Sequence, residues 1–140
     1  MERLVDTPGA FSEGRGVGLV EIDEATNEGE LIAGCWFEKW NGVNVHMHIA
    51  AKPDRKWMTR EFLWYCFHYP FVELGCARVT GYVEAQNFDA RRFDEHLGFE
   101  VEATLKGAAP TGDVLVYVLW RDKCRWLKLR PPKWAQQTEH

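Results

Sequence analysis

The spacing of apolar residues changes along the chain, and these changes limit the folds that it can adopt. Residues 17–51 hold three β-like stretches separated by turn signals. From residue 59 to 74, apolar side chains recur instead at three- and four-residue intervals, the period of an α-helix. A further β-like stretch, a short helical stretch and two final β-like stretches follow. This order predicts a single α/β domain of the mixed α+β kind.

The elements can be placed from these patterns and from the turn residues between them. We expect strands at 17–23, 31–40, 43–51, 77–85, 99–107 and 113–121, and helices at 59–74 and 88–97. The first three strands follow one another through short turns, which predicts an antiparallel meander. Pro70 predicts a kink or a break in the longer helix, and Gly98 ends the shorter one.

The third strand of this meander has two distinct faces. Its apolar side chains fall on one face and its polar side chains on the other, namely Val43, Val45, Met47 and Ile49 against Asn44, His46 and His48. We expect a single domain over residues 1–140, with a loose start at residues 1–16 and a surface tail at residues 123–140.

Charge and cysteine usage exclude several classes of protein. The net charge of −4 argues against electrostatic binding to nucleic acid, and we expect no nucleic-acid partner. No apolar run is long enough to span a bilayer, so we expect no membrane partner. The four cysteines lack zinc-site spacing, which predicts no metal and reduced thiols in a cytoplasmic protein.

The segment 52–60, with the sequence KPDRKWMTR, is locally basic although the whole chain is acidic. Such a patch can hold a phosphorylated small molecule. The alternative is an ordinary solvated surface.

Residues 71–99 carry a spaced set of motifs. An aromatic residue is followed by Leu-Gly at a helix end, by an arginine that opens a strand, by Asn-x-x-Ala and by a closing Leu-Gly-Phe. These positions are Phe71, Leu74, Gly75, Arg78, Asn87, Ala90, Leu97, Gly98 and Phe99. With this spacing the chain resembles the GNAT superfamily of N-acetyltransferases, especially the branch that acetylates ribosomal proteins and protein N-termini.

The resemblance implies a fold and a cofactor site. The fold is a central, mostly antiparallel sheet of six to seven strands, flanked by helices and splayed between 43–51 and 77–86. The pantetheine arm of acetyl-CoA would lie in the gap, near Met47 and Ile49 on one side and Asn87 and Ala90 on the other. Asn87 can instead simply cap the helix that follows it, a role that asparagine performs well.

The family's pyrophosphate loop is degenerate in this sequence. In the family, glycines in a Q/R-x-x-G-x-G/A loop let phosphate approach the backbone closely. Here the loop corresponds to residues 54–59, and Trp57 and Thr59 stand where the glycines are expected. By resemblance, the residues of this loop and of the helix start that would bind cofactor are Arg55, Lys56, Trp57, Met58, Thr59 and Arg60.

The family's usual catalytic residues are also replaced. Val43 stands where many members have a glutamate base, and Asp94 stands where many have a tyrosine acid. The remaining candidates for proton transfer are His46, His48, Glu84 and Asp94, whose side chains can exchange protons near neutral pH when suitably placed. A surface or structural role is the alternative for each of them.

The resemblance therefore predicts a transferase that moves an acetyl group from acetyl-CoA to an amine of a protein or a small molecule. Relatives are often dimers, so it also implies a homodimer. The alternative is a non-catalytic GNAT-fold module that binds a partner and has lost the cofactor or the chemistry.

Overall fold

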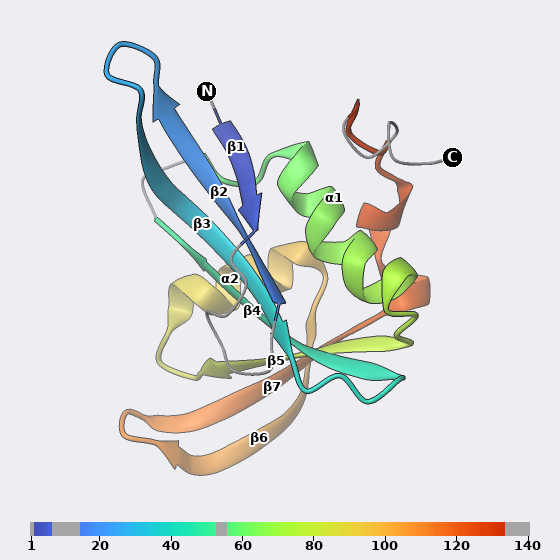
Figure 1. Cartoon of the computed structure of the whole chain (residues 1–140). Coiled ribbons are helices and arrows are strands. Elements are labelled where there is room, and N and C mark those ends of the chain that lie inside the picture. The colour runs from blue at the N-terminus through green and yellow to red at the C-terminus, as the bar shows by residue number, and fades with distance from the viewer. Residues whose placement is uncertain (1, 7–14, 53–55, 134–140) are drawn as a thin grey trace.

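The computed structural model describes residues 2–6, 15–52 and 56–133, and contains one seven-stranded sheet (Figure 1). The order across the sheet is β1-β2-β3-β4-β5-β7-β6. The strands are β1 (Glu2–Asp6), β2 (Arg15–Asp23), β3 (Glu28–Glu38), β4 (Asn44–Ala51), β5 (Arg78–Glu84), β6 (Glu100–Ala109) and β7 (Gly112–Trp120). All neighbours are antiparallel except β4 and β5. The predicted mixed fold with a mostly antiparallel sheet is confirmed.

Two helices follow the positions expected from apolar spacing. Helix α1 (Arg60–His68) continues into a π-helical turn, η1 (Tyr69–Glu73), with Pro70 in its first turn. The predicted break at Pro70 is confirmed, because the helix changes type there. Helix α2 (Phe88–Leu97) ends at Gly98, whose left-handed φ of 109° suits glycine.

The pairing between β4 and β5 is short, although both strands are longer. Only three residue pairs join them, from Asn44 opposite Arg78 to His46 opposite Thr80. Beyond this point β4 stays paired with β3, and β5 stays paired with β7. The sheet is therefore splayed in its middle, which confirms the predicted splay between 43–51 and 77–86.

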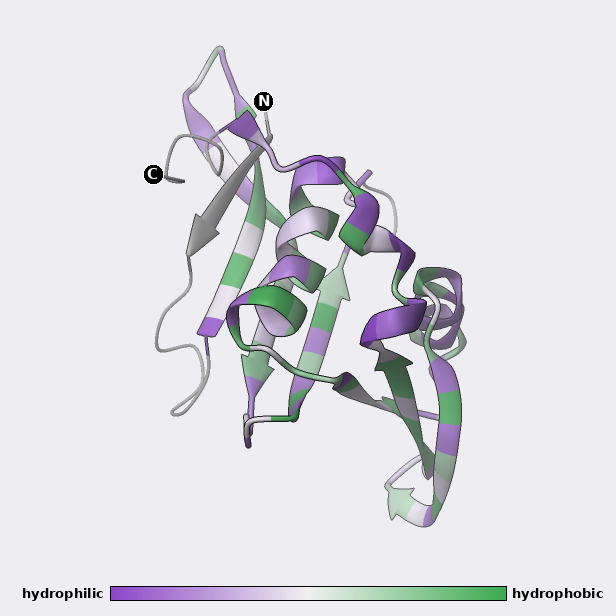
Figure 2. Cartoon of the chain, turned by 90° about the vertical axis from the view of Figure 1, so that its right-hand side faces the viewer, coloured by the Kyte–Doolittle hydropathy of each residue, from purple (hydrophilic) through white to green (hydrophobic). Residues whose placement is uncertain are grey.

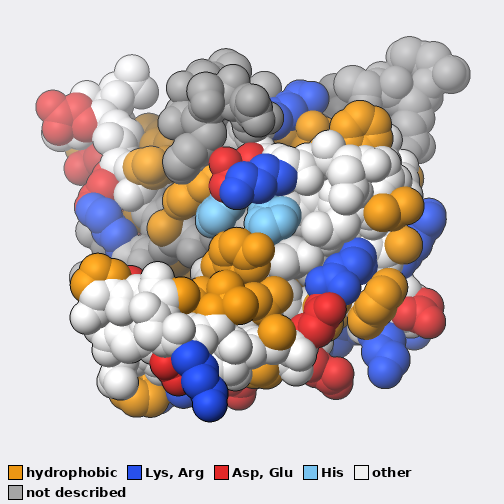
Figure 3. All heavy atoms as spheres, turned by 90° about the horizontal axis from the view of Figure 1, so that it is seen from below, with side chains coloured by type: hydrophobic (Ala, Val, Ile, Leu, Met, Phe, Trp, Pro, Cys, Tyr) orange, Lys and Arg blue, Asp and Glu red, His pale blue; other side chains and the backbone are white. Residues whose placement is uncertain are grey.

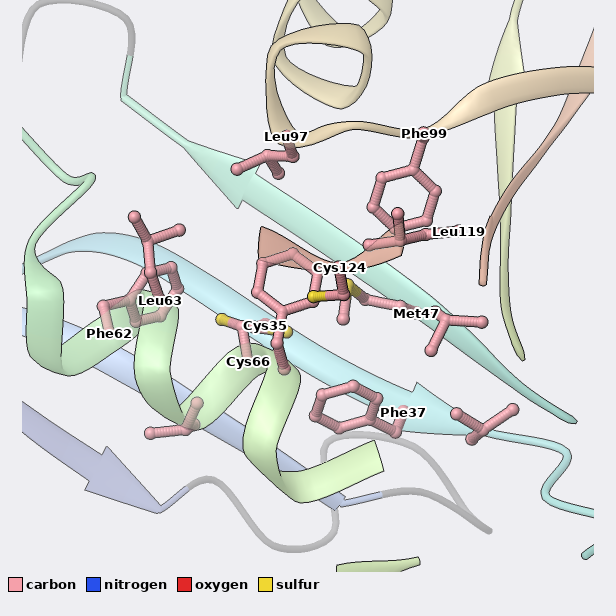
Figure 4. Close-up of a cluster of buried hydrophobic side chains, with 14 of the residues drawn as sticks. Cys35, Phe37, Met47, Phe62, Leu63, Cys66, Leu97, Phe99, Leu119 and Cys124 are labelled. Carbon is pink, nitrogen blue, oxygen red and sulfur yellow. The ribbon is translucent and has the colours of Figure 1, made fainter. Parts of the chain in front are cut away.

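Both α-helices lie over the same face of the sheet, and Figure 2 shows α1 lying across it. Buried side chains of β3, β4, α1 and the α2 end meet in one core (Figure 4). Strand β5 turns Val79, Gly81 and Val83 toward this core, and α2 reaches it through Asp94 and Leu97. The opposite face carries the alternate residues of the same strands. We call it the open face, because no helix within the described residues covers it.

Both chain ends correct the sequence-based expectation. Residues 2–6 of the predicted loose start form β1, which adds an edge strand to β2. Residues 7–14 of that start, and 134–140 of the predicted tail, lie outside the described residues. The tail packs on the core through the 3₁₀ turns η2 (Arg121–Lys123) and η3 (Arg125–Lys128). Such short segments carry too little periodicity to be recognised in the sequence.

Trp126 fastens this C-terminal segment to the helices. Its ring stacks with Phe67 of α1 at 6.2 Å between centroids, and its indole N–H donates to the Leu97 carbonyl at 2.8 Å. Cys124, two residues earlier, is buried. The segment therefore belongs to the folded domain.

Replacing Trp126 with alanine should lower the free energy of unfolding by about 3 kcal/mol, because a packed aromatic side chain and its hydrogen bond are lost. Val72→Ala is the control, since Val72 is 48% exposed, and should change stability by less than about 0.5 kcal/mol. Urea denaturation measures both. Equal stabilities of the two variants would show that the tail contributes nothing to the fold.

Candidate functional site

A cavity of about 320 Å³ opens where β4 and β5 separate. Its lining comes from the diverging strands, from α2 and from β3. The lining residues are Trp36, Met47, His48, Ile49, Ala50, Gly81, Tyr82, Val83, Glu84, Asn87, Ala90, Asp94 and Phe99. We call this cavity the slot. It brings together seven of the predicted site residues, namely Met47, His48, Ile49, Glu84, Asn87, Ala90 and Asp94.

The slot is lined from both sides of the sheet. Met47, Gly81 and Asp94 reach it from the face that carries the helices. Tyr82 and Glu84 alternate with Gly81 and Val83 along β5, so they reach it from the open face. The splay thus forms a passage at which a molecule lying against the helices can meet one arriving at the open face.

Asp94 lies at the helix-covered side of the slot, near the β4 backbone. A methyl group at Gly81 would lie 3.7 Å from Asp94 Oδ2 and 3.8 Å from the Met47 carbonyl oxygen. Burial, helped by the neighbouring Glu95 charge, raises the pKa of the Asp94 carboxyl to about 7. Such a carboxyl holds a proton near neutral pH and can either donate or accept one.

Asn87 caps α2, as the alternative interpretation expected. Its side-chain oxygen accepts a hydrogen bond from the Ala90 N–H at 3.2 Å. The cap uses the oxygen of the side-chain amide, whereas the NH₂ group of the same amide is a donor. Because Asn87 also lines the slot, the cap does not exclude a contact with a bound molecule, and that second role stays a prediction.

The two histidines of β4 lie on the open face. His48 contacts Glu38 at 2.9 Å and stacks on Trp36 at 5.7 Å between ring centroids. His46 meets Tyr82 edge-on at 5.0 Å, and it is not among the residues that line the slot. Burial, followed by the Lys39 charge, lowers the pKa of the His46 imidazole. Figure 3 shows histidine side chains, in pale blue, beside hydrophobic side chains on the molecular surface.

The segment before α1 differs from a glycine loop. The Trp57 side chain is buried and meets Phe62 and Phe93 edge-on, so it packs between α1 and α2. The Trp57 carbonyl accepts from the Thr59 N–H at 2.8 Å, and the Thr59 hydroxyl oxygen caps α1 by accepting from the Phe62 N–H.

This geometry gives the side chains of three predicted phosphate-site residues structural roles, and phosphate binding by their backbone N–H groups stays a prediction. Trp57 and Thr59 serve the core and the helix cap, and Met58 packs against the core. Lys56 and Arg60 remain exposed at the start of α1, where the positive end of the helix dipole favours anions. Arg60 borders a surface hollow together with Leu19, Thr59 and Glu61. Arg55 lies outside the described residues.

Several slot residues were missed in the sequence. They are Trp36, Ala50, Gly81, Tyr82, Val83 and Phe99. The alternation within residues 77–85 contained a usable signal, because it places Gly81 and Val83 on one face of β5 and Tyr82 and Glu84 on the other. Trp36 gave no such signal, since it lies on a different strand.

Neither a metal site nor a membrane span is apparent in the part of the chain that the structure describes. No group of three or more His, Cys, Asp or Glu side chains there could hold a metal ion. None of the helices in these ranges is long and apolar enough to cross a bilayer.

The sequence and the structure can be compared with those of known proteins. No family model and no curated protein matches the sequence. A variant of spermidine N-acetyltransferase from Vibrio cholerae matches the structure with a TM-score of 0.64 at 20% identity, over 85% of this chain and 71% of that one. A complex of the Vibrio cholerae enzyme with CoA and spermine matches with a TM-score of 0.61 at 18% identity, over 80% and 68% of the two chains.

A dodecameric form of the same Vibrio cholerae enzyme also matches, with a TM-score of 0.61 at 19% identity over 80% of this chain and 67% of that one. These enzymes are members of the GNAT superfamily. The splayed sheet and its two helices are therefore the GNAT N-acetyltransferase fold, as the sequence resemblance predicted.

The raised pKa of Asp94 predicts how stability depends on pH. Between pH 3.8, the ordinary carboxyl pKa, and about pH 7 the folded chain keeps a proton that the unfolded chain releases. Stability contributed by this site is therefore fully present below pH 3.8 and is lost as pH rises to about 7. Asp94→Asn should match the parent protein at pH 4 and be more stable than it at pH 8.

Chemical denaturation at the two pH values measures this difference. Asp89→Asn is the control, because Asp89 is exposed in the first turn of the same helix, and it should gain no stability at pH 8. An equal stability change for Asp94→Asn at pH 4 and pH 8 would contradict the assignment of this titration to Asp94.

Proposed function

We propose that the protein is an N-acetyltransferase that moves an acetyl group from acetyl-CoA to an amine. This proposal rests mainly on the slot. It lies at the β4–β5 splay of a GNAT fold, and it is lined by backbone, amide and carboxyl groups suited to an acyl arm and a reacting amine. The complex of a structural neighbour with CoA and spermine supports the same class of reaction.

The backbone of β4 has the position needed to hold the thioester. After His46, β4 has no pairing partner in β5, so its polar backbone groups on that side are available to a ligand. We assign the stretch Met47 to Ile49 to the acetyl-CoA arm, with one N–H stabilising the oxyanion that forms during transfer. Asn87 and Ala90 would contact the arm from the start of α2.

Acetyl transfer requires a proton donor for the leaving sulfur, and we assign this role to Asp94. An ammonium substrate first loses one proton, and its nitrogen then bonds to the thioester carbon and loses a second proton while the carbon–sulfur bond breaks. The leaving sulfur takes up one proton, so each turnover releases one proton from an ammonium substrate. Asp94 donates to the leaving sulfur from the helix-covered side. The candidates for accepting the amine proton are His48 and Glu84, whereas His46 lies outside the slot.

Calorimetric titration with acetyl-CoA, followed by detection of free thiol in the presence of amines, tests the proposal. We expect binding and amine-dependent release of CoA. A well-folded protein that binds no acetyl-CoA and releases no thiol with any amine would contradict the proposal and favour the non-catalytic module.

Asn87 variants separate helix capping from ligand contact. Asn87→Ser and Asn87→Asp keep a capping oxygen and should retain the melting temperature, whereas Asn87→Ala should lose about 1 kcal/mol of stability. All three lack the side-chain NH₂ donor, so each should bind acetyl-CoA about fivefold more weakly, because one hydrogen bond is lost. Full affinity in both capping variants would leave Asn87 with the cap alone.

The exposed cations at the start of α1 should hold the phosphates. The double change Lys56→Glu with Arg60→Glu should weaken CoA binding at least tenfold and flatten its dependence on salt, because charge attraction is screened by ions. Lys106→Glu, an exposed change on β6, is the matched control and should leave both quantities unaltered. Unchanged affinity in the double variant would place the phosphates elsewhere.

A further inference from the structure

The C-terminal segment 121–133 has a charge opposite to that of the rest of the chain. Its net charge is +5, whereas the whole chain carries −4, so the remaining residues carry −9. The expectation of no nucleic-acid partner rests on the whole-chain value, but a partner meets a local surface. The segment contains one acidic residue, Asp122, and six basic residues, namely Arg121, Lys123, Arg125, Lys128, Arg130 and Lys133.

The fold leaves these six cations on the surface. The segment runs beside α1 (Figure 1), where Trp126 stacks on Phe67, and Cys124 and Pro132 are buried. Its apolar side chains therefore face the core. All six basic residues are exposed, and none of them forms an ion pair within the described residues. We call these six cations together the basic surface.

Hydrogen bonds hold the backbone under the basic surface in place. The Trp126 indole N–H donates to the Leu97 carbonyl at 2.8 Å, and Arg125 donates to the neighbouring His96 carbonyl. The cations therefore project from a backbone that is fixed to the end of α2. A partner that binds them does not have to order the segment first, which lowers the entropic cost of binding.

A surface hollow of about 600 Å³ lies at the start of the basic surface. Trp120, at the end of β7, is 44% exposed and lines this hollow. The Arg78 guanidinium lies 5.2 Å from the centroid of the Trp120 ring, which favours one orientation of the ring. The other lining residues are Gly75, Ala77, Arg121, Asp122 and Leu127. We call this hollow the Trp120 hollow.

An exposed aromatic ring beside exposed cations is suited to a single-stranded nucleic acid. The bases of a single strand can stack on aromatic side chains while its phosphates contact lysine and arginine. The Asp122 carboxylate disfavours a phosphate inside the hollow, but it can accept a hydrogen bond from the amino group of a base. This chemistry assigns a base to the hollow and phosphates to the cations outside it.

Two other anionic partners fit this surface less well. In a duplex the bases are already paired and stacked, so none of them can enter the Trp120 hollow. An anionic bilayer is bound most firmly by segments that insert apolar side chains among the lipids. The apolar side chains of segment 121–133 face the protein core instead, so only its charges would contact a bilayer.

We propose that the basic surface and the Trp120 hollow bind single-stranded nucleic acid, with one base stacked on Trp120 and phosphates on the exposed cations. None of these residues lines the slot. The binding activity is therefore separate from the proposed acetyl transfer and does not depend on it.

Fluorescence anisotropy with a labelled RNA dodecamer of mixed sequence tests this binding on the full chain. If about four phosphates are contacted, the affinity should fall about fiftyfold as the KCl concentration rises from 50 to 200 mM. The same dodecamer annealed to its complement should bind at least tenfold more weakly. Vesicles of phosphatidylcholine and phosphatidylglycerol should not retain the protein on sedimentation.

Two kinds of variant separate the phosphate contacts from the base contact. Lys123→Glu combined with Lys128→Glu should weaken binding at least tenfold and reduce its salt dependence, because phosphate contacts are lost. Trp120→Ala should weaken binding about tenfold and leave the salt dependence unchanged, because stacking releases no counterions. Trp120→Phe keeps an aromatic ring and should retain most of the affinity.

A second double variant is the matched control. Arg92→Glu combined with Lys106→Glu changes the net charge by the same amount at exposed positions on α2 and β6. It should weaken binding less than threefold, because these residues lie outside the basic surface. Melting temperatures should show that all the variants are folded.

Several results would overturn the proposal. One is a folded protein that does not bind the dodecamer in 50 mM KCl, and others are a preference for the duplex or for the vesicles. Equal weakening by the two double variants would reduce the effect to overall charge. Loss of binding in Lys56→Glu with Arg60→Glu, while Lys123→Glu with Lys128→Glu still binds fully, would place the oligonucleotide at the proposed CoA phosphate site instead.

Discussion

The early end of the β4–β5 pairing is the constraint on which the site depends. Three residue pairs hold the two halves of the sheet together, after which the strands separate and leave backbone groups without a strand partner. A polar network on the open face fixes this junction. The Thr80 hydroxyl donates to Asn44 across it at 2.7 Å, and Arg78 donates to both Thr80 and Glu102. The strands are thus joined at one end and separated at the other.

In the segment before α1, a packed aromatic residue stands where the family's loop has a flexible glycine. Trp57 fills the space between the two helices, and Thr59 caps α1. The loop position is therefore set by burial of a large side chain, and we propose that positive charge on Lys56 and Arg60 replaces the backbone contacts that a glycine loop makes with phosphate. In the proposed site, an electrostatic contact for phosphates would lie beside a slot for the acyl arm.

Much of the fold was predictable from the sequence, because its signals are local. Asn87 and Gly98 marked both ends of α2, and Pro70 marked the change at the end of α1. The strand β1 and the packed segment around Trp126 were not predictable, because their positions depend on contacts with distant residues. The slot was predictable in part. Family spacing indicated Asn87 and Asp94, but the raised pKa of Asp94 and the contribution of Trp36 arise only when separate strands meet.

Hydrogen exchange of the β4 backbone, with and without saturating coenzyme A, tests whether the slot holds the cofactor arm. If the slot holds the cofactor arm, those amides from Met47 to Ala50 that point away from β3 should exchange several-fold more slowly in the complex, because ligand groups replace water as their partners. The amides of β2 and β6 should change little. Binding of coenzyme A that protects other segments and leaves residues 47–50 unchanged would show that the slot does not hold the cofactor arm.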